Sequence, residues 1–181
     1  MSRQTVIEGV VFVVLVSFCV VMRLAEHAAN FAPVAAAALF AGFWFRRRAM
    51  AFAFPLVAMG VSDAFIGTYH VGIMIVVYAA MLFPLVWRTV LRSRLTAVRV
   101  GLCAASGSVV FFVGTNLAVW LFGPLYEHTA AGLAQCYVAA LPFFRNTMCG
   151  DLVWSATFFG AYVLATRLAR RATFVPATVA G

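Results

Sequence analysis

The sequence predicts an all-α membrane protein, a six-transmembrane-helix bundle with a short re-entrant or interfacial helix between the fifth and sixth helices. Hydrophobic residues make up 65% of the 181 residues and charged residues only 10%. The mean hydropathy is +1.03, which is far from the balance of a soluble domain. The apolar residues also gather in long runs, with no repeat or soluble segment between them. We therefore expect residues 1–181 to form a single integral membrane domain.

Six apolar runs define the expected spans. A helix needs about 20 residues to cross a bilayer core of about 30 Å, so the second run is short and the fifth is long enough to tilt. The first run could belong to a signal peptide, but Glu8 interrupts it and no clean cleavage site follows, so we expect it to be retained. The runs are residues 6–24, 30–45, 51–66, 71–90, 98–122 and 152–168.

A polar stretch at residues 126–151 separates the last two spans. It holds several charged and amide side chains, a density that lipid does not tolerate. Residues 129–141 within it have apolar side chains at helical spacing, but a helix of that length reaches only about 20 Å. We therefore expect a re-entrant or interfacial helix that roofs a polar pocket and ends at Pro142.

The arginines predict the orientation of the chain. All thirteen positive residues are arginine. In a six-span arrangement only Arg23 and Arg145 lie on one side, and the remaining eleven lie on the other. Positive residues in short loops stay in the cytoplasm, so both termini are expected there. The eleven are Arg3, Arg46, Arg47, Arg48, Arg88, Arg92, Arg94, Arg99, Arg167, Arg170 and Arg171.

The opposite, outer side holds all three histidines and four of the five acids, namely Glu26, His27, Asp63, His70, Glu127, His128 and Asp151. Ionisable groups near a membrane usually mark a ligand or ion pathway, and helical spacing aligns Asp63 with Met59, Asn116 with Trp120, and Asp151 with Ser155. If these stripes converge, they form a small-molecule pocket. The alternative is that they only join helices by hydrogen bonds. The candidate ligand-binding residues are Asn30, Asp63, Tyr69, His70, Asn116, Trp120, Arg145, Asn146, Asp151 and Ser155.

Small residues line one side of the second span and would let another helix approach closely. That helix could belong to this chain or to a separate membrane subunit. The candidate docking residues are Ala28, Ala32, Ala36, Ala37, Ala38, Ala41 and Gly42.

Other chemistries find little support. No HExxH, paired histidine or Cys-rich spacing indicates a metal, and no nucleophile elbow indicates an enzyme. We expect no cofactor and, since no recognition module accompanies the basic charge, no nucleic acid partner. Cys136 and Cys149 could form a disulfide if their segment faces an oxidising compartment.

Three stretches carry a resemblance to a known family: RLAEHAANFAPVAAAALFAG, FPLVAMGVSDAFIGTYH and VGTNLAVWLFGPLYEHTAAGLAQCYVAALPFFRNTMCGDL. Over nearly the whole chain beyond residue 22, the sequence resembles a bacterial family of small membrane proteins of uncharacterised function. Members are sometimes described as substrate-binding (S) components of energy-coupling-factor (ECF) vitamin transporters.

That resemblance implies a six-helix subunit of the bacterial cytoplasmic membrane that captures a vitamin-sized solute from outside. It would dock to a transmembrane coupling subunit carrying two ATPases, and Ala28, Ala32 and Ala36, or Ala37 and Ala41, match the alanine face used for docking. In several such components that face lies in the first helix, whereas here it lies in the second span.

The competing hypothesis is a structural or assembly membrane protein without a ligand. The outer side has four carboxylates against two arginines, which favours a cationic or zwitterionic solute.

Overall fold

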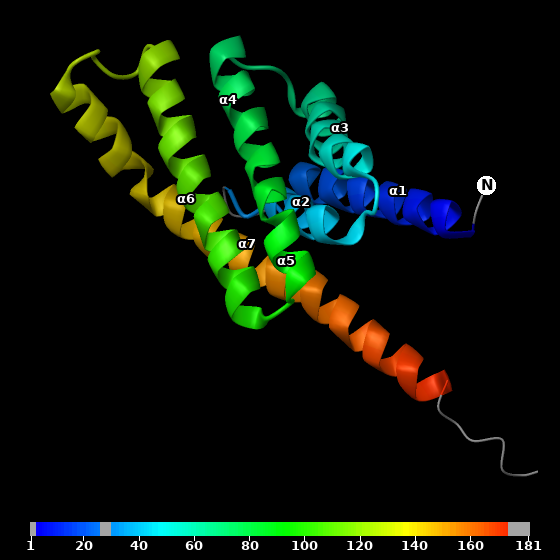
Figure 1. The fold of residues 1–181 in the computed structure, drawn as a ribbon. Helices are drawn as coiled ribbons and strands as arrows, with labels where there is room; N and C mark the ends of the chain where they lie inside the picture. Colours follow the sequence, from blue (N-terminus) through cyan, green and yellow to red (C-terminus); the bar gives the residue numbers. More distant parts are fainter. Residues whose placement is uncertain (1–2, 26–29, 174–181) are drawn as a thin grey trace, which may run out of the picture.

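The computed structural model describes residues 3–25 and 30–173, and every regular element in these ranges is helical. Because α4, the 3₁₀ helix η1 and α5 follow one another without a break, the described residues form six helical rods, which can be followed in Figure 1. The elements are α1 (Arg3–Leu24), α2 (Val34–Trp44), α3 (Arg48–Ile66), α4 (Val71–Leu82), η1 (Phe83–Trp87), α5 (Arg88–Ser93), α6 (Ala97–Phe122) and α7 (Ala130–Thr173). The all-α prediction is confirmed.

Five of the rods are long and apolar enough to cross a membrane: Arg3–Leu24, Arg48–Ile66, Val71–Ser93, Ala97–Phe122 and Ala130–Arg171. The exception is α2. Its 11 residues give a length of about 16 Å, roughly half of a bilayer core. The predicted second span is therefore a short helix that does not reach across by itself.

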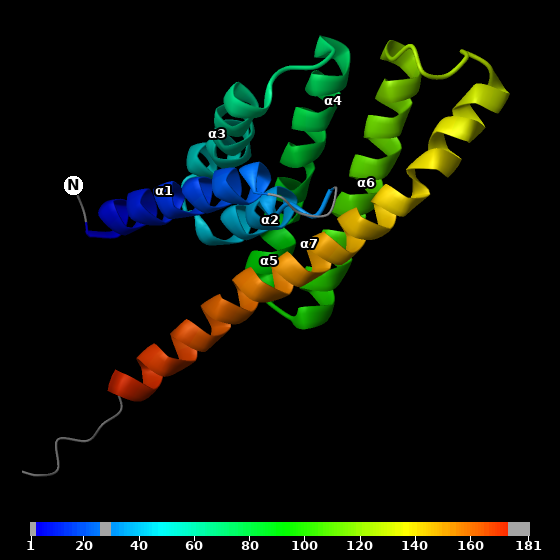
Figure 2. The same ribbon diagram turned by 180° about the vertical axis from the view of Figure 1, so that it is seen from behind.

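The helices pack in two groups around α2. In one group, α6 packs extensively against both α7 and α4, and in the other α1 packs against α3. Helix α2 contacts α3, η1 and α7 and so joins the groups. Figure 2 shows α7 running diagonally along the bundle, with its C-terminal end and the N-terminal end of α1 both on the left side of the view.

Local sequence explains where the helices begin and end. Pro33 is the N-cap of α2 and Gly67, with a φ of 104°, ends α3, in keeping with the preference for proline at helix starts and glycine after helix ends. Pro84 lies at the start of η1, where it converts the helix to 3₁₀ geometry. Thr96 accepts a hydrogen bond from the Arg99 backbone N–H and caps α6.

Helix α7 corrects the prediction for the end of the chain. The expected interfacial helix at 129–141 and the sixth span at 152–168 are parts of one helix of 44 residues, with Pro142 inside it. Pro142 has no N–H for the Val138 carbonyl, and this loss bends a helix rather than ending it when packing holds both halves. Figure 1 shows the change of direction in the yellow part of α7.

The continuous helix also separates Cys136 from Cys149. Thirteen residues of helix place their Cα atoms about 20 Å apart, beyond the roughly 7 Å limit for a disulfide. All four cysteines are free, and among them only Cys149 is exposed. The two thiols considered for pairing therefore cannot bridge in this fold.

The small residues of α2 form the centre of the core rather than a surface. Ala36, Ala37, Ala38 and Ala41 are each at most 1% exposed, and Gly42 is buried with Leu85 of η1 directly against it. Small side chains allow this close approach. The partner of the alanine face is thus this chain itself. Ala32 is half-buried, and Ala28 lies outside the described residues.

Two arginines hold the end of α2 in place. Arg88 donates to the carbonyl groups of Gly42, Phe45 and Arg46, each at 2.8 Å. Arg92 donates to those of Phe43 and Phe45 at 2.7 and 2.6 Å. A guanidinium group has five N–H donors in a fixed plane, which suits the unpaired carbonyls at a helix end. The short helix is therefore capped by side chains from α5.

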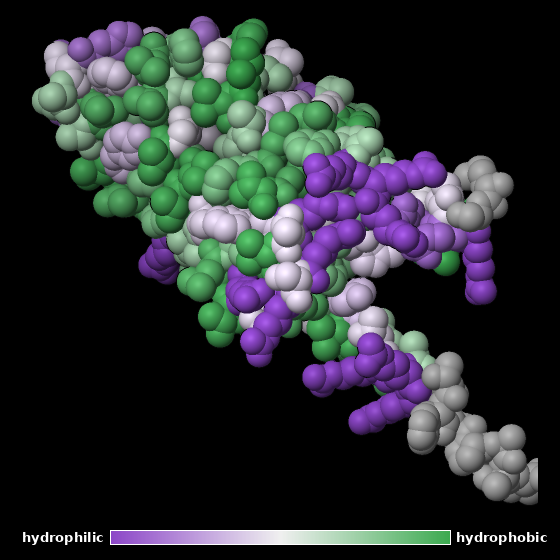
Figure 3. All heavy atoms as spheres, in the orientation of Figure 1, coloured by the Kyte–Doolittle hydropathy of each residue, from purple (hydrophilic) through white to green (hydrophobic). Residues whose placement is uncertain are grey.

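Most of the polar surface lies at one end of the molecule, and a smaller part lies at the opposite end. Figure 3 shows hydrophilic side chains gathered where α1 begins and α7 ends, with hydrophobic atoms covering most of the body between this end and the α6–α7 turn. This distribution agrees with the arginine asymmetry in the sequence. A wide apolar surface between two polar ends is the form of a membrane protein.

Candidate functional site

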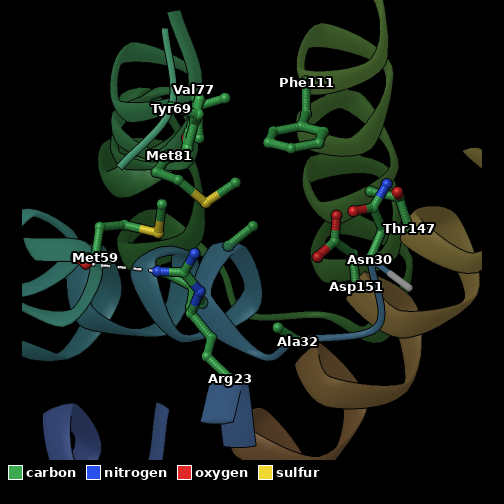
Figure 4. Close-up of a pocket in the computed structure, with 12 residues that line it drawn as sticks. Arg23, Asn30, Ala32, Met59, Tyr69, Val77, Met81, Phe111, Thr147 and Asp151 are labelled. Carbon is green, nitrogen blue, oxygen red and sulfur yellow. Dashed lines mark hydrogen bonds between the residues drawn. The ribbon is translucent and has the colours of Figure 1, made fainter. Parts of the chain in front are cut away.

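A cavity of about 240 Å³ lies among α1, α3, α4, α6, α7 and the segment before α2. Its polar lining residues are Arg23, Asn30, Tyr69, Thr147 and Asp151. Its apolar walls include Met59, Val77, Met81 and Phe111. Figure 4 shows Arg23 and Asp151 entering from different sides, with Phe111, Met81 and Val77 above them. An apolar pocket with a few placed polar groups is typical of a small-molecule site.

Arg23 reaches the cavity from the end of α1 and is held by α3. Its Nη2 lies 2.9 Å from Asp63 Oδ1, with the two side chains 17% and 5% exposed. Its Nη1 donates to the Ser62 hydroxyl and, at 3.5 Å, to the Met59 carbonyl. Tyr78 of α4 donates to the other Asp63 oxygen at 2.8 Å. The cluster therefore ties α1, α3 and α4 together and balances the charge of Asp63.

Asp151 approaches from α7 and is held by α6. The Ser108 hydroxyl donates to Asp151 Oδ2 at 2.6 Å, a short distance typical of a charge-assisted bond. Asp151 is only 5% exposed, yet it lines the cavity. The side chain therefore presents a carboxylate to the cavity from within the interior of the bundle.

The segment that carries Asn30 is fixed against α7. Trp154 donates from its indole N–H to the Phe31 carbonyl at 2.9 Å, and a Cβ added to Gly150 would lie 3.3 Å from the Phe31 Cα. Asn30 itself has a φ of 62°, a left-handed conformation that asparagine tolerates better than most residues. These contacts position Asn30 beside Thr147 and Asp151 (Figure 4).

Tyr69 lies in the turn between α3 and α4 and lines the same cavity, although it is 39% exposed. Asn30 is also exposed, so these two residues mark the mouth. Partial burial raises the pKa of the Tyr69 phenol; the negative charge of Asp63 adds to the rise, and Arg23 opposes it. The phenol therefore keeps its proton at neutral pH and can donate a hydrogen bond at the entrance.

A second cavity of about 220 Å³ adjoins the first between α4, α6 and α7. The two share Asn30, Val77, Phe111 and Thr147 in their linings. Asn116 lines the second cavity and donates to the Phe112 carbonyl of its own helix at 2.8 Å. Together the cavities reach the size range of small-ligand pockets, which starts at roughly 300 Å³.

The structure brings some predicted site residues together. Asn30, Tyr69 and Asp151 line the first cavity, and Asn116 lines the second. Asp63 lies just behind the wall, where it holds Arg23. Glu26 and His27, which were also assigned to the outer side, lie outside the described residues.

Other predicted residues lie elsewhere. His70 accepts a hydrogen bond from the Gly72 N–H at the start of α4 and stacks on Phe122. Trp120 donates to the Glu127 carbonyl. Arg145 is exposed on α7 and Asn146 is half-buried, and neither lines the cavities described above. Ser155 lines a separate, mostly apolar groove of about 580 Å³ between α6 and α7.

Sequence reasoning did not select Arg23 and Thr147 as site residues, although both line the first cavity. Arg23 had a usable signal, because it is one of only two arginines on the outer side of the six-span arrangement. Thr147 had none, since it donates to the Phe143 carbonyl as any threonine in a helix can. Only the packing of α7 against the Asn30 segment reveals its place.

The fold and the cavity define the chain as a multi-helix membrane-type protein with an internal polar pocket. The chain belongs to a family of unknown function, DUF6580, whose model matches residues 3–175. This confirms the resemblance to an uncharacterised family. Comparison with curated proteins gave no match, and comparison with solved structures gave none.

Proposed function

We propose that the protein is a non-catalytic, solute-binding subunit of the bacterial cytoplasmic membrane that serves import. The observation that carries this proposal is the cavity lined by Arg23, Asp151 and Asn30. Charged groups inside a membrane bundle are expensive to maintain and are usually functional. A ligand that contacts them explains why a chain with only 10% charged residues keeps them there.

The arginine distribution gives the proposed direction. With the arginine-rich end in the cytoplasm, both described chain ends face the cell interior and the α3–α4 and α6–α7 turns face outward. Tyr69, at the mouth of the cavity, belongs to the first of these outer turns. A solute would therefore enter from outside, as import requires. The exposed apolar side chains of α1, including Val10, Val13 and Val14, would face the lipid bilayer.

The kinship to ECF S components remains part of this proposal, together with a coupling subunit and its ATPases as partners. No phosphate-binding loop occurs in the sequence, so energy for import would come from such partners. Because the α2 alanines are buried, we place no docking surface on them. A coupling subunit would have to contact another face.

The second candidate is a structural or assembly protein without a ligand. It is favoured by the fact that the polar groups also connect helices, since Asp63 joins α1, α3 and α4 and Asp151 joins α6 and α7. Interhelical hydrogen bonds in membranes are worth about 1 kcal/mol each. In this case the cavity would be a packing defect that binds nothing specifically.

Ligand retention separates the two functions. Native mass spectrometry of protein purified from its own membrane would reveal a co-purifying small molecule if the solute-binding proposal is correct. Thermal unfolding, monitored by tryptophan fluorescence, should show that a bound solute raises the unfolding temperature of the protein. The variants Thr147→Val and Asn116→Ala should reduce this rise. Glu127→Gln, on the exposed α6–α7 turn, is the matched control and should behave as wild type.

The structural candidate predicts that no small molecule co-purifies with the protein. It also predicts that no solute raises the unfolding temperature of the wild type or the variants. Uptake by cells expressing the protein would then be the same as in cells lacking it.

A further inference from the structure

Among the described residues, Asp151 is the one acid that lines the cavity, and no cationic side chain balances its charge. Asp63 has Arg23 beside it, and Glu8, the other buried acid among the described residues, accepts a hydrogen bond from the Arg46 backbone N–H away from the cavity. Asp151 receives only the Ser108 hydroxyl, on Oδ2. Within residues 3–25 and 30–173 no cationic side chain pairs with it, and Oδ1 accepts no hydrogen bond.

This imbalance points to the missing partner. A carboxylate that is 5% exposed and lacks a counter-charge is strongly disfavoured in an apolar interior. Because Asp151 lines the cavity, a cation bound there would lie against it and relieve the cost. A neutral solute would leave the energetic cost of the buried carboxylate unchanged, and an anionic solute would add electrostatic repulsion.

The other walls suit an organic cation. Phe111 offers an aromatic ring to the cavity and Met81 a polarisable thioether (Figure 4), and aromatic faces attract cations. Arg23 has five N–H donors, of which the contacts with Ser62, Met59 and Asp63 use three. The remaining donors can bind an oxygen atom of the solute. Two adjoining cavities of about 240 and 220 Å³ also exceed the volume of one water molecule, roughly 30 Å³, several times over.

We infer that the solute is a small protonated organic amine whose ammonium group contacts Asp151 and whose oxygen acceptor faces Arg23. This inference rests on the proposed solute-binding function and specifies its substrate class. It assigns Asp151 as the residue that selects for positive charge.

The test compares amines with their uncharged isosteres. Purified protein in lipid nanodiscs would be titrated with a panel of small hydroxy- and carboxy-amines, including ethanolamine paired with 1-propanol, and with NaCl as an inorganic cation. Unfolding temperature and isothermal titration calorimetry would report binding. Asp151→Asn keeps the shape of the side chain and removes its charge. Glu8→Gln, a second buried carboxylate changed to an amide, is the matched control.

We expect one or more amines to bind while the matched isostere does not. Asp151→Asn should weaken that binding about tenfold to a hundredfold, the value of a charge-assisted hydrogen bond, and Glu8→Gln should leave it unchanged. If Asp151→Asn does not fold, Asp151→Glu would retain the preference for amines over isosteres.

Other outcomes overturn the inference. Tight binding of a neutral or anionic solute that Asp151→Asn leaves unchanged would refute the substrate class while sustaining solute binding. Stabilisation by Na⁺ that Asp151→Asn abolishes, with no response to amines, would assign the site to an inorganic ion. Binding of no compound, with no co-purifying molecule, would remove the proposed function as well.

Discussion

Replacing Asp63 by asparagine leaves the Arg23 guanidinium without its counter-charge in the interior of the bundle. The two charges lie within 2.9 Å, and Asp63 is 4% exposed. A pair at about 4 Å attracts by roughly 4 kcal/mol at an effective dielectric constant of 20. Removing one partner of a buried pair typically costs about 3–5 kcal/mol. Since Arg23 is partly exposed and keeps its contacts with Ser62 and Met59, we expect the lower end, about 3 kcal/mol.

A double-mutant cycle measures this coupling. Asp63→Asn, Arg23→Met and the double variant would be unfolded by SDS titration in mixed micelles, with tryptophan fluorescence as the signal. The double variant should be destabilised by clearly less than the sum of the single variants, because each single variant leaves one charge unpaired and the double variant leaves none. Tyr78→Phe, which removes one hydrogen bond to Asp63, should cost only about 1 kcal/mol. Additive single effects, or a loss at Asp63→Asn no larger than at Tyr78→Phe, would refute the reasoning.

Three further changes test the fold. Arg88→Met removes three carbonyl contacts at the end of α2 and should lower the free energy of unfolding by about 2–4 kcal/mol. Arg47→Met, at an exposed position, should have little effect. Equal losses in the two variants would contradict the capping role of Arg88. Gly72→Ala would place a Cβ 2.8 Å from the Phe122 ring and should cost about 1–3 kcal/mol in the same titration, while an unchanged midpoint would show that α4 and α6 are not in close contact. Pro142→Ala should keep the fold and raise its stability by up to about 3 kcal/mol, because the alanine N–H can complete the bond to the Val138 carbonyl; a destabilised variant would show that the bend is needed for packing.

Much of the helical pattern was predictable because hydropathy reports directly on burial in lipid. The expected spans at 6–24, 51–66 and 98–122 agree with α1, α3 and α6 to within a few residues. The span at 71–90 agrees with the continuous α4–η1–α5 rod. In each case a long apolar run ends at glycine, arginine or a capping residue, so the end of the apolar run coincides with a local signal that ends a helix.

The second half of the chain was harder to predict because polarity does not determine whether a helix continues. The Pro142–Asn146 segment combines a proline with polar residues, and the sequence pattern favoured a break there. The helix continues through this segment, since α6 contacts α7 on both sides of Pro142, through Tyr137 before it and Asp151 after it. Packing between distant helices of this kind does not produce a local sequence pattern.

The site was partly predictable for a similar reason. Asp63, Asn116 and Asp151 stood out because carboxylate and amide groups are rare in apolar runs. Which of them share a cavity depends on how the helices pack. Asp63 therefore lies behind Arg23, while Ser155 faces a different groove. His70 was chosen by residue type and Trp120 because helical spacing aligns it with Asn116, but their polar atoms contact backbone groups near helix ends.

The most direct test of a ligand-binding cavity is a crystal structure of the protein purified from its own membrane. Solute binding predicts electron density for a small molecule between Arg23 and Asp151, within hydrogen-bond distance of the Asp151 carboxylate. A cavity filled by its own side chains, or by a lipid acyl chain that contacts neither residue, would contradict the account.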